Sequence, residues 1–575
     1  MLSRRNFGAL LALPLARLGA QGMATRNVRP VARGKPSGLP FAAKFTDVAR
    51  QAGLHEQVIW GPVDRKTYVL ETVGCGAAFL DYDNDGWLDI FVLSGSRMEG
   101  APGATNRLYR NNRDGTFTDV TERAGLRRTG WASAVAVGDY NNDGFEDLFV
   151  TYWGGYVLYR NNGDGTFTDV TEQAGLRHGS TTRMGSGCTF VDYDRDGRLD
   201  LFVASYLDFD PKKVPPPGQD STCTWKGIAV HCGPRGLPPG TASLYRNNGD
   251  GTFTDVSVAS GVAKARGSYL MTAVAADLDN DGWPDIYVAG DSTPSFLFRN
   301  NHDGTFREVG VRSGAALNED GSVQAGMGVA VGDYDLNGSL DLLKTHFADD
   351  TSILYRNDGK GFFDDVTIAS GLAVETRYVG WGAGMVDLDN DGLPDLFIAT
   401  GGVFPEVAAK LPAYPMETPC VIFRNLGSGR FEELMPEAVA HCSRGCAFGD
   451  FDNDGDVDVL VVNLNEPPSL LRNDVRGGGH WLKVKLAGVK SNRSAIGARV
   501  IARYGGRQQA QEVLSQSSFY SANDPRLHFG LGAAESADLE IRWPNGEREL
   551  VGGVKADQLV VIREGAGIVQ RGWTK

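Results

Sequence analysis

Recognisable catalytic motifs are missing from this sequence of 575 residues. It has no G-x-S-x-G elbow, no H-E-x-x-H motif and no Walker loop. It has only eight histidines and seven cysteines, and no cysteine pair has zinc-ribbon spacing. The sequence therefore offers no standard nucleophile, nucleotide site or zinc site on which to base a function.

Acidic residues also outnumber basic ones, and the formal net charge is −14. An acidic surface repels phosphate backbones, so nucleic acid is not an expected partner. Beyond the N-terminus no apolar run approaches the length of a membrane span, so we expect no transmembrane span in the mature chain.

The N-terminus has the pattern of an export signal. Arg4 and Arg5 precede an apolar run from Gly8 to Leu18, which is too short to span a bilayer and typical of a signal peptide. The paired arginines resemble a bacterial Tat signal, and a Sec signal is the alternative. We expect residues 1–22 to be the signal, with cleavage near Ala20, and a periplasmic, cell-surface or secreted bacterial protein.

Two close cysteine pairs are disulfide candidates in an oxidising compartment. Cys223 and Cys232 flank eight residues of a proline-rich insertion, and Cys442 and Cys446 bracket three residues. The other cysteines are Cys75, Cys188 and Cys420, of which at least one must remain a free thiol.

One pattern recurs seven times, roughly 50 to 85 residues apart, a period typical of propeller blades. It reads Asp-x-Asp/Asn-x-Asp/Asn-Gly-x-x-Asp, and we call each copy an Asp loop. The acidic and amide positions are Asp81, Asp83, Asp85 and Asp89; Asp139, Asn141, Asp143 and Asp147; Asp192, Asp194, Asp196 and Asp200; Asp277, Asp279, Asp281 and Asp285; Asp333, Asp335, Asn337 and Asp341; Asp387, Asp389, Asp391 and Asp395; and Asp450, Asp452, Asp454 and Asp458.

Each Asp loop lies between two apolar segments, which predicts the turn of a hairpin. A second hairpin follows, as in Leu158–Asn162, Gly163–Gly165 and Thr166–Val170. Four strands per repeat, seven times, predict a seven-bladed β-propeller over residues 41–476. The last copy has no outer strand of its own, and the strand Phe45–Val48 precedes every Asp loop, so we expect it to complete the last blade.

The rest of the chain has the alternating pattern of a small β domain. We expect Gly477–Gly479 to be a flexible joint, residues 480–555 to form a β-sandwich-like domain and residues 556–575 to be a tail. The predicted fold class is therefore all-β.

The alternating carboxylates of the Asp loops predict metal binding. Hard oxygen ligands in this number suit Ca²⁺ better than Mg²⁺ or zinc, so we expect about seven structural calcium sites. Asn141 and Asn337 replace aspartate and can ligate through the amide oxygen. The alternative is that these sequences only form turns.

These motifs resemble known families. The Asp loops are similar to FG-GAP/VCBS repeats, which implies an integrin-like propeller with calcium on one face. Asn492–Ala498, Gln516–Ser518 and His528–Gly532 resemble an ASPIC/UnbV domain. Together with Cys232–Pro234, they make the chain similar to bacterial members of the cartilage acidic protein family.

We expect a ligand on the face opposite the Asp loops, near the central channel, because two insertions, at residues 208–240 and 401–420, open there. The candidate residues are Trp131, Tyr152, Trp153, Arg183, Tyr206, Tyr269, Asp291, His346, Arg377 and His441. The alternatives are that Trp131 and Trp381 plug the channel and that the two histidines bind loop backbone.

Two functions follow from this sequence. The first is a binding or adhesion scaffold for a carbohydrate or an extracellular or periplasmic protein. The second is an extracytoplasmic enzyme, with or without a transition metal, whose site at the channel mouth uses His346, His441, Arg183 or Tyr206.

Overall fold

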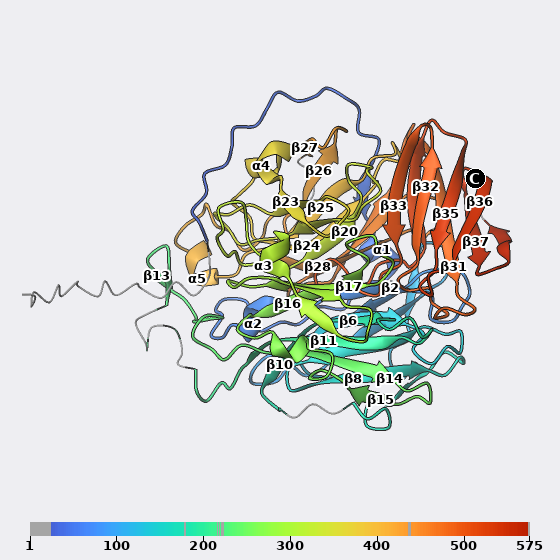
Figure 1. Ribbon diagram of the computed structural model, residues 1–575. Coiled ribbons are helices and arrows are strands. Elements are labelled where there is room, and N and C mark those ends of the chain that lie inside the picture. Colours follow the sequence, from blue (N-terminus) through green and yellow to red (C-terminus); the bar gives the residue numbers. More distant parts are fainter. Residues whose placement is uncertain are drawn as a thin grey trace, which may run out of the picture.

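The computed structural model describes residues 25–176, 180–214, 217, 219, 223–434 and 439–572, and the expected signal at 1–22 lies outside them. Within these ranges the chain is built almost entirely from β-strands (Figure 1). The expected all-β fold class is confirmed.

Seven four-stranded antiparallel sheets form the larger part of the molecule. The first is β2 (Ala77–Leu80), β3 (Asp89–Val92), β4 (Arg107–Asn111) and β5 (Phe117–Asp119). The second is β6 (Ala132–Gly138), β7 (Asp147–Tyr152), β8 (Gly155–Asn161) and β9 (Phe167–Asp169). The third is β10 (Arg183–Val191), β11 (Asp200–Asp208), β14 (Ala242–Asn247) and β15 (Phe253–Asp255).

The remaining four sheets repeat this order. The fourth is β16 (Leu270–Ala276), β17 (Asp285–Gly290), β18 (Phe296–Asn300) and β19 (Phe306–Glu308). The fifth is β20 (Val329–Gly332), β21 (Asp341–Lys344), β22 (Ile353–Asn357) and β23 (Phe363–Asp365). The sixth is β24 (Gly380–Val386), β25 (Asp395–Thr400), β26 (Val421–Asn425) and β27 (Phe431–Leu434). The seventh is β28 (Ser443–Gly449), β29 (Asp458–Asn463), β30 (Ser469–Asn473) and β1 (Phe45–Asp47).

The outer strand of the seventh sheet comes from the other end of the chain, as expected. Phe45 lies opposite Asn473 and Asp47 opposite Leu471. The inner strands contact one another in the order β2, β6, β10, β16, β20, β24 and β28, and β28 also contacts β2. The seven sheets are therefore the blades of a β-propeller.

The helices are short and lie in the connections. They are α1 (Ala49–Ala52), α2 (Leu70–Val73), α3 (Gly310–Ser313), α4 (Thr367–Ser370) and α5 (Pro405–Ala408), with 3-10 turns at Val262–Lys264 and Leu372–Val374. No helix in the described part of the chain has the length and apolar character needed to cross a membrane. A small hairpin, β12 (Thr224–Trp225) and β13 (Ile228–Ala229), lies in the first insertion.

The C-terminal domain contains two further four-stranded sheets. One is β31 (His480–Ala487), β34 (Leu527–Gly532), β37 (Gln558–Arg563) and β38 (Gly567–Gly572). The other is β32 (Arg499–Tyr504), β33 (Arg507–Glu512), β35 (Ser536–Arg542) and β36 (Arg548–Lys555). Leu482, Val484 and Val560 of the first sheet share one buried core with Val500 and Ile541 of the second.

Two expectations about this domain are wrong. Residues 556–575 were expected to be a tail, but β37 pairs in parallel with β31, and β38 pairs with β37. Gly477–Gly479 were expected to be a free joint, but a Cβ on Gly479 would lie 2.1 Å from the carbonyl oxygen of Asn390. The connection is therefore packed against the sixth Asp loop, which composition alone could not indicate.

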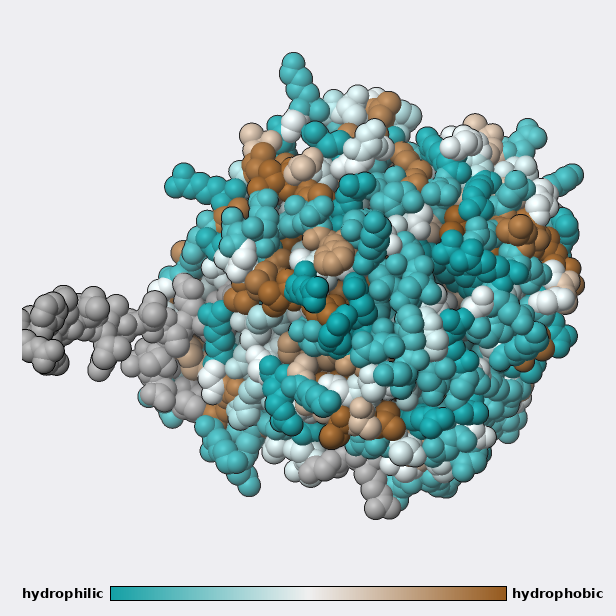
Figure 2. Space-filling model, viewed as in Figure 1, coloured by the Kyte–Doolittle hydropathy of each residue, from teal (hydrophilic) through white to brown (hydrophobic). Residues whose placement is uncertain are grey.

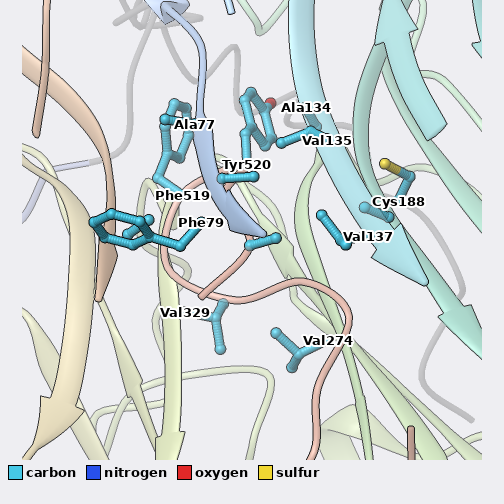
Figure 3. Packing of buried hydrophobic residues seen from close by; sticks show 14 of the residues in the cluster. Ala77, Phe79, Ala134, Val135, Val137, Cys188, Val274, Val329, Phe519 and Tyr520 are labelled. Atoms are coloured by element: carbon cyan, nitrogen blue, oxygen red, sulfur yellow. The ribbon is translucent and has the colours of Figure 1, made fainter. Parts of the chain in front are cut away.

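A loop of the C-terminal domain fills the propeller channel. Figure 3 shows Phe519 and Tyr520 among buried residues of the inner strands. The Phe519 ring stacks on Tyr520 with centroids 4.0 Å apart and meets Trp381 at 5.1 Å, and the Arg444 guanidinium lies 4.0 Å over Trp381. The channel is therefore occupied by an aromatic column, to which Trp381 belongs.

Hydrogen bonds join this loop to all seven inner strands. Small inner-strand residues allow the close approach: a Cβ on Gly76 would lie 1.9 Å from the carbonyl oxygen of Tyr520. The bonds on the blade side involve Ala77 and Phe79, Val135, Cys188, Met271, Val329, Ala383 and Phe448.

A ring of asparagines ties each blade to the blade before it. Each third strand ends in an asparagine whose Nδ2 donates to the backbone carbonyl of the second residue of the neighbouring Asp loop. These seven pairs are Asn111 to Phe451, Asn161 to Tyr82, Asn247 to Tyr140, Asn300 to Tyr193, Asn357 to Leu278, Asn425 to Tyr334 and Asn473 to Leu388. All seven asparagines are buried.

We expect Asn161→Ala to lower the free energy of unfolding by about 1–3 kcal/mol, because the carbonyls of Tyr82 and Glu146 lose a buried donor. Chemical denaturation would measure it. The matched control is Asn162→Ala, since Asn162 is exposed and its side chain bonds to the side chains of Arg160, Thr166 and Thr168 rather than to another blade. Equal effects of the two substitutions would contradict a role for the asparagine ring.

Candidate metal centres

The seven Asp loops share one backbone geometry. In each loop the glycine at position six has a positive φ, such as 84° at Gly197, and its N–H donates to the first aspartate. The residue at position four is also left-handed, which the sequence marks with asparagine in five loops but with Arg195 and Leu336 in the third and fifth. Both features turn the carboxylates inward.

The ninth aspartate is the first residue of each second strand, and it is buried in all seven loops. In the first loop, Asp89 Oδ1 accepts the backbone N–H of Asn111 at 2.8 Å and Oδ2 accepts that of Tyr82 at 3.3 Å. The same pair of bonds occurs in five of the other six loops, and in the fourth loop Asp285 accepts, among the described residues, only the N–H of Asn300. The asparagine that ties neighbouring blades thus also positions a carboxylate.

In the third, fifth and sixth loops, three carboxylates converge from positions one, three and nine. They are Asp192, Asp194 and Asp200; Asp333, Asp335 and Asp341; and Asp387, Asp389 and Asp395, with one oxygen of each within 4.8 Å of the others. In the first and fourth loops the group is Asp81, Asp83 and Asp85 or Asp277, Asp279 and Asp281.

Several of these oxygens are buried without a hydrogen-bond partner among the described residues. Oδ1 of Asp192, Asp333 and Asp387 has none, although these aspartates are only 1–3% exposed. Burial, reinforced by Asp196 and Asp194, raises the pKa of Asp192 to about 7. Burial likewise raises the pKa of Asp333 to about 7. Buried carboxylates with free oxygens fit a bound cation.

The donor set indicates which cation fits. All ligand candidates are carboxylate or amide oxygens, and the turn leaves backbone carbonyls nearby, as in hard-cation sites. Soft or borderline metals prefer nitrogen or sulfur ligands, which these sets lack. Ca²⁺, with its many oxygen ligands, suits the loops best.

Two protein-family models match this chain. An FG-GAP-like repeat model matches residues 81–150, 139–203, 236–288 and 277–343, and a model described as ASPIC and UnbV matches residues 488–569. This chain is an FG-GAP-repeat protein with a C-terminal ASPIC and UnbV domain.

Two curated proteins are similar to this chain in sequence. Human cartilage acidic protein 1 is 25% identical over 63% of this chain and 51% of its own length, and the mouse protein is 25% identical over 63% and 52%. The chain therefore spans about half the length of these relatives. A solved Agrocybe aegerita lectin, described as recognising non-reducing terminal N-acetylglucosamine, is 19% identical, covers 68% of this chain and 87% of its own, and has a TM-score of 0.34.

The ASPIC and UnbV domain lies directly on the Asp loops. Lys483 Nζ bonds to Asp450, Lys485 Nζ lies 3.7 Å from Asp81 Oδ2, and Arg499 lies 3.8 Å from Asp277 Oδ2. The backbone N–H of Ala510 donates to Asp333 Oδ2 at 2.9 Å. These contacts could not be predicted from the sequence, since they join segments far apart in the chain.

The ten ligand-face candidates do not form one open site. Six are buried: Trp131, Tyr152, Tyr206, Tyr269, Asp291 and His346. Trp153, Arg183 and His441 are half-buried, and Arg377 is exposed. Tyr206 and Asp291 do meet, since the tyrosine hydroxyl donates to Asp291 Oδ2 at 2.6 Å, but His441 instead pairs with Glu466.

The insertions explain this burial. Residues of the first insertion fold back over the face, so that the Tyr269 hydroxyl donates to the carbonyl of Leu237 and the Trp153 Nε1–H to that of Phe209. Phe519 and Tyr520 fill the channel itself, and a ligand on this face near the channel stays a prediction. Trp131 packs edge-to-face on Trp60 as a core residue.

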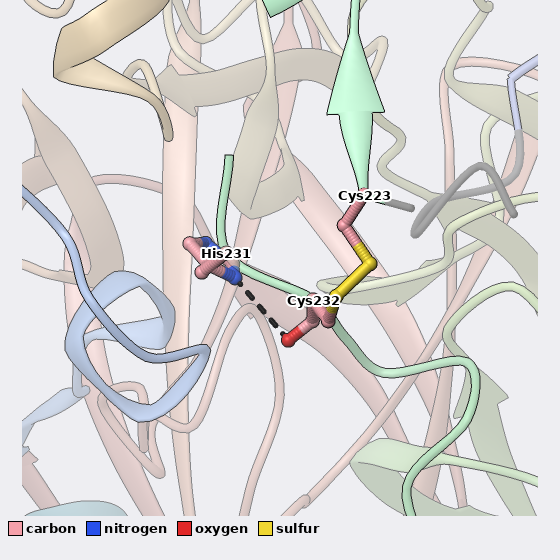
Figure 4. Close-up of a disulfide and its surroundings, with 3 residues drawn as sticks. All are labelled: Cys223, His231 and Cys232. Atoms are coloured by element: carbon pink, nitrogen blue, oxygen red, sulfur yellow. Dashed lines mark hydrogen bonds between the residues drawn. A yellow bond between two sulfur atoms is a disulfide. The ribbon is translucent and has the colours of Figure 1, made fainter. Parts of the chain in front are cut away.

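One of the two disulfide candidates is formed. Figure 4 shows the bond between Cys223 and Cys232, whose Cα atoms lie 5.3 Å apart. Cys442 and Cys446 are not bonded. Cys446 lies within the extended strand β28 and Cys442 just before it, so three residues of extended chain hold them beyond disulfide reach.

We expect a calcium chelator to lower the melting temperature of the full-length protein markedly. Without a cation, the grouped buried carboxylates repel one another. A free ion concentration 1,000 times the Kd of its site stabilises the folded state by about 4 kcal/mol. Differential scanning calorimetry with and without EDTA would measure the shift, and EDTA saturated with calcium is the control. Identical melting curves would contradict metal binding by the loops.

Proposed function

We propose that this protein is an exported calcium-binding scaffold that holds a carbohydrate or an extracytoplasmic protein on the face opposite its Asp loops. The observation that carries the metal part is the set of buried, unpartnered carboxylate oxygens on Asp192, Asp333 and Asp387. Calcium in these loops would fix the turns between inner and second strands, so its role is structural.

Export is supported by two independent features. The N-terminal segment has paired arginines, Arg4 and Arg5, followed by an apolar run. The Cys223–Cys232 disulfide is of a kind that persists in oxidising compartments. On the face in Figure 2 hydrophilic residues predominate and hydrophobic residues form separate groups, as expected for a protein in water.

The ligand face is supported by an aromatic cluster where the two insertions meet. Trp225 of the first insertion lies 4.7 Å from Tyr414 and 6.0 Å from Phe404 of the second, and 5.5 Å from Phe347, measured between ring centroids. The Trp225 Nε1–H is buried with no hydrogen-bond partner among the described residues.

A small depression opens at this cluster and is lined in part by Arg377 and Tyr378. The Arg377 guanidinium lies over the Tyr378 ring at 4.8 Å, and its side chain is about half exposed. Aromatic faces combined with a few polar donors are typical of ligand sites, and they suit the alternating apolar and hydroxyl faces of a sugar or a protein side chain.

We expect the double substitution Arg377→Ala and Tyr378→Ala to weaken ligand binding at least tenfold. A glycan array probed with calcium-loaded full-length protein tests a carbohydrate ligand, and crosslinking in the extracytoplasmic fraction tests a protein ligand. Arg127→Ala is the control, because Arg127 is an exposed arginine on another part of the propeller, paired with Glu122. Unchanged binding by the double variant would contradict this location.

A further inference from the structure

The seven Asp loops fall into different classes when their first aspartates are compared. In the third, fifth and sixth loops, Oδ1 of Asp192, Asp333 and Asp387 has no partner among the described residues, and only Oδ2 is hydrogen-bonded. In these loops the first, third and ninth carboxylates converge. The free oxygen and the convergence together make a cage ready for an ion.

In the first, fourth and seventh loops both oxygens of the first aspartate are already bonded. Oδ1 accepts the N–H of the fifth residue and Oδ2 that of the glycine, as at Asp450 with Asp454 and Gly455. The unpartnered oxygens of these loops lie instead on Asp83, Asp285 and Asp452.

The same three loops receive a cation from the ASPIC and UnbV domain. The cations are Lys485 at Asp81, Arg499 at Asp277 and Lys483 at Asp450. Lys483 and Asp450 are both buried, with side chains 3% and 1% exposed. Within the described ranges, no ion pair joins a lysine or arginine of this domain to Asp192, Asp333 or Asp387, and Arg499 reaches the fifth loop only at the carbonyl of Gly338, to which it donates at 2.7 Å.

We propose that the ASPIC and UnbV domain takes the place of calcium at the first, fourth and seventh Asp loops, so that calcium fills only the others. Two positive charges held close to one buried carboxylate repel each other strongly where water does not screen them. Lys483, Lys485 and Arg499 therefore serve as tethered counter-ions and fasten the domain to the propeller. The inference rests on the proposed calcium binding and assigns which loops perform it.

The second loop belongs to neither class. Both oxygens of Asp139 are bonded within the loop, and Asn141 lowers the charge of the loop. The Asp139 N–H donates to Ser494 Oγ, and the Arg493 guanidinium of the domain lies against Gly144 without an ion pair to Asp139. The expected content is therefore three ions per chain, or four when the second loop is also filled.

Metal analysis of the full-length protein, equilibrated with calcium in excess of the loops and then freed of unbound ion, tests the count. Three or four calcium ions per chain support the proposal. Five or more overturn it and leave the proposed function intact. A chain that retains no calcium overturns both.

Matched substitutions locate the ions. We expect Asp333→Asn and Asp387→Asn each to remove about one calcium per chain, and Asp450→Asn and Asp277→Asn to leave the count unchanged. Loss of one ion in Asp450→Asn would overturn the proposal. Circular dichroism checks that each variant is folded.

Lys483→Met gives the converse test, because it removes the tethered charge and keeps the side-chain volume. We expect this variant to bind one more calcium than the wild type and to need it for stability, so that EDTA lowers its melting temperature further than that of the wild type. A folded Lys483→Met protein with an unchanged calcium count would overturn the assignment of Lys483. Should it fail to fold, the Asp450→Asn count decides.

Discussion

In every blade, one asparagine links three parts of this molecule through its backbone N–H and its side-chain amide. The asparagine that ends the third strand gives its backbone N–H to the ninth aspartate of its own loop and its side-chain N–H to the loop of the preceding blade, as Asn473 does with Asp458 and Leu388. Ring geometry and the position of a metal ligand therefore depend on one residue. Because all seven asparagines are buried, water does not replace these hydrogen bonds in the folded state.

The ASPIC and UnbV domain adds further contacts to the Asp loops. It places charged and backbone groups on the Asp loops and sends Phe519 and Tyr520 down the propeller axis. Propeller and domain therefore share an interface on that side. On the opposite face, the disulfide-linked insertion folds over part of the propeller, where the Tyr269 hydroxyl donates to the carbonyl of Leu237.

Local periodicity made much of the fold predictable. The Asp loops, the four strands of each blade and the pairing of Phe45 with the strand at Leu471 all follow from repeated, short-range patterns. The asparagine at the end of each third strand recurs in the sequence. Its acceptor is a backbone carbonyl in another blade, which the spacing of residues in the sequence does not reveal. The roles of Lys483 and Arg499 were hidden for the same reason.

The ligand face shows where the sequence could not decide. Tyr206 lies near the end of β11 and His346 follows β21, and whether they reach solvent depends on how two long insertions fold over them. Loop length indicates that such a cover exists but not its path. The plug at Phe519 has no hydrophobic period, since small polar residues flank it and bind inner-strand backbone.

The pairing of β1 with β30 has a consequence for folding during biosynthesis. The strand at Phe45 leaves the ribosome early, whereas its partner at Asn473 is synthesised only after every other blade. Until then both edges of the nascent array are bare, and such edges readily pair with other chains. Completion of the ring is thus a late step of biogenesis, and a chaperone that shields the first strand would have the whole time of translation in which to act.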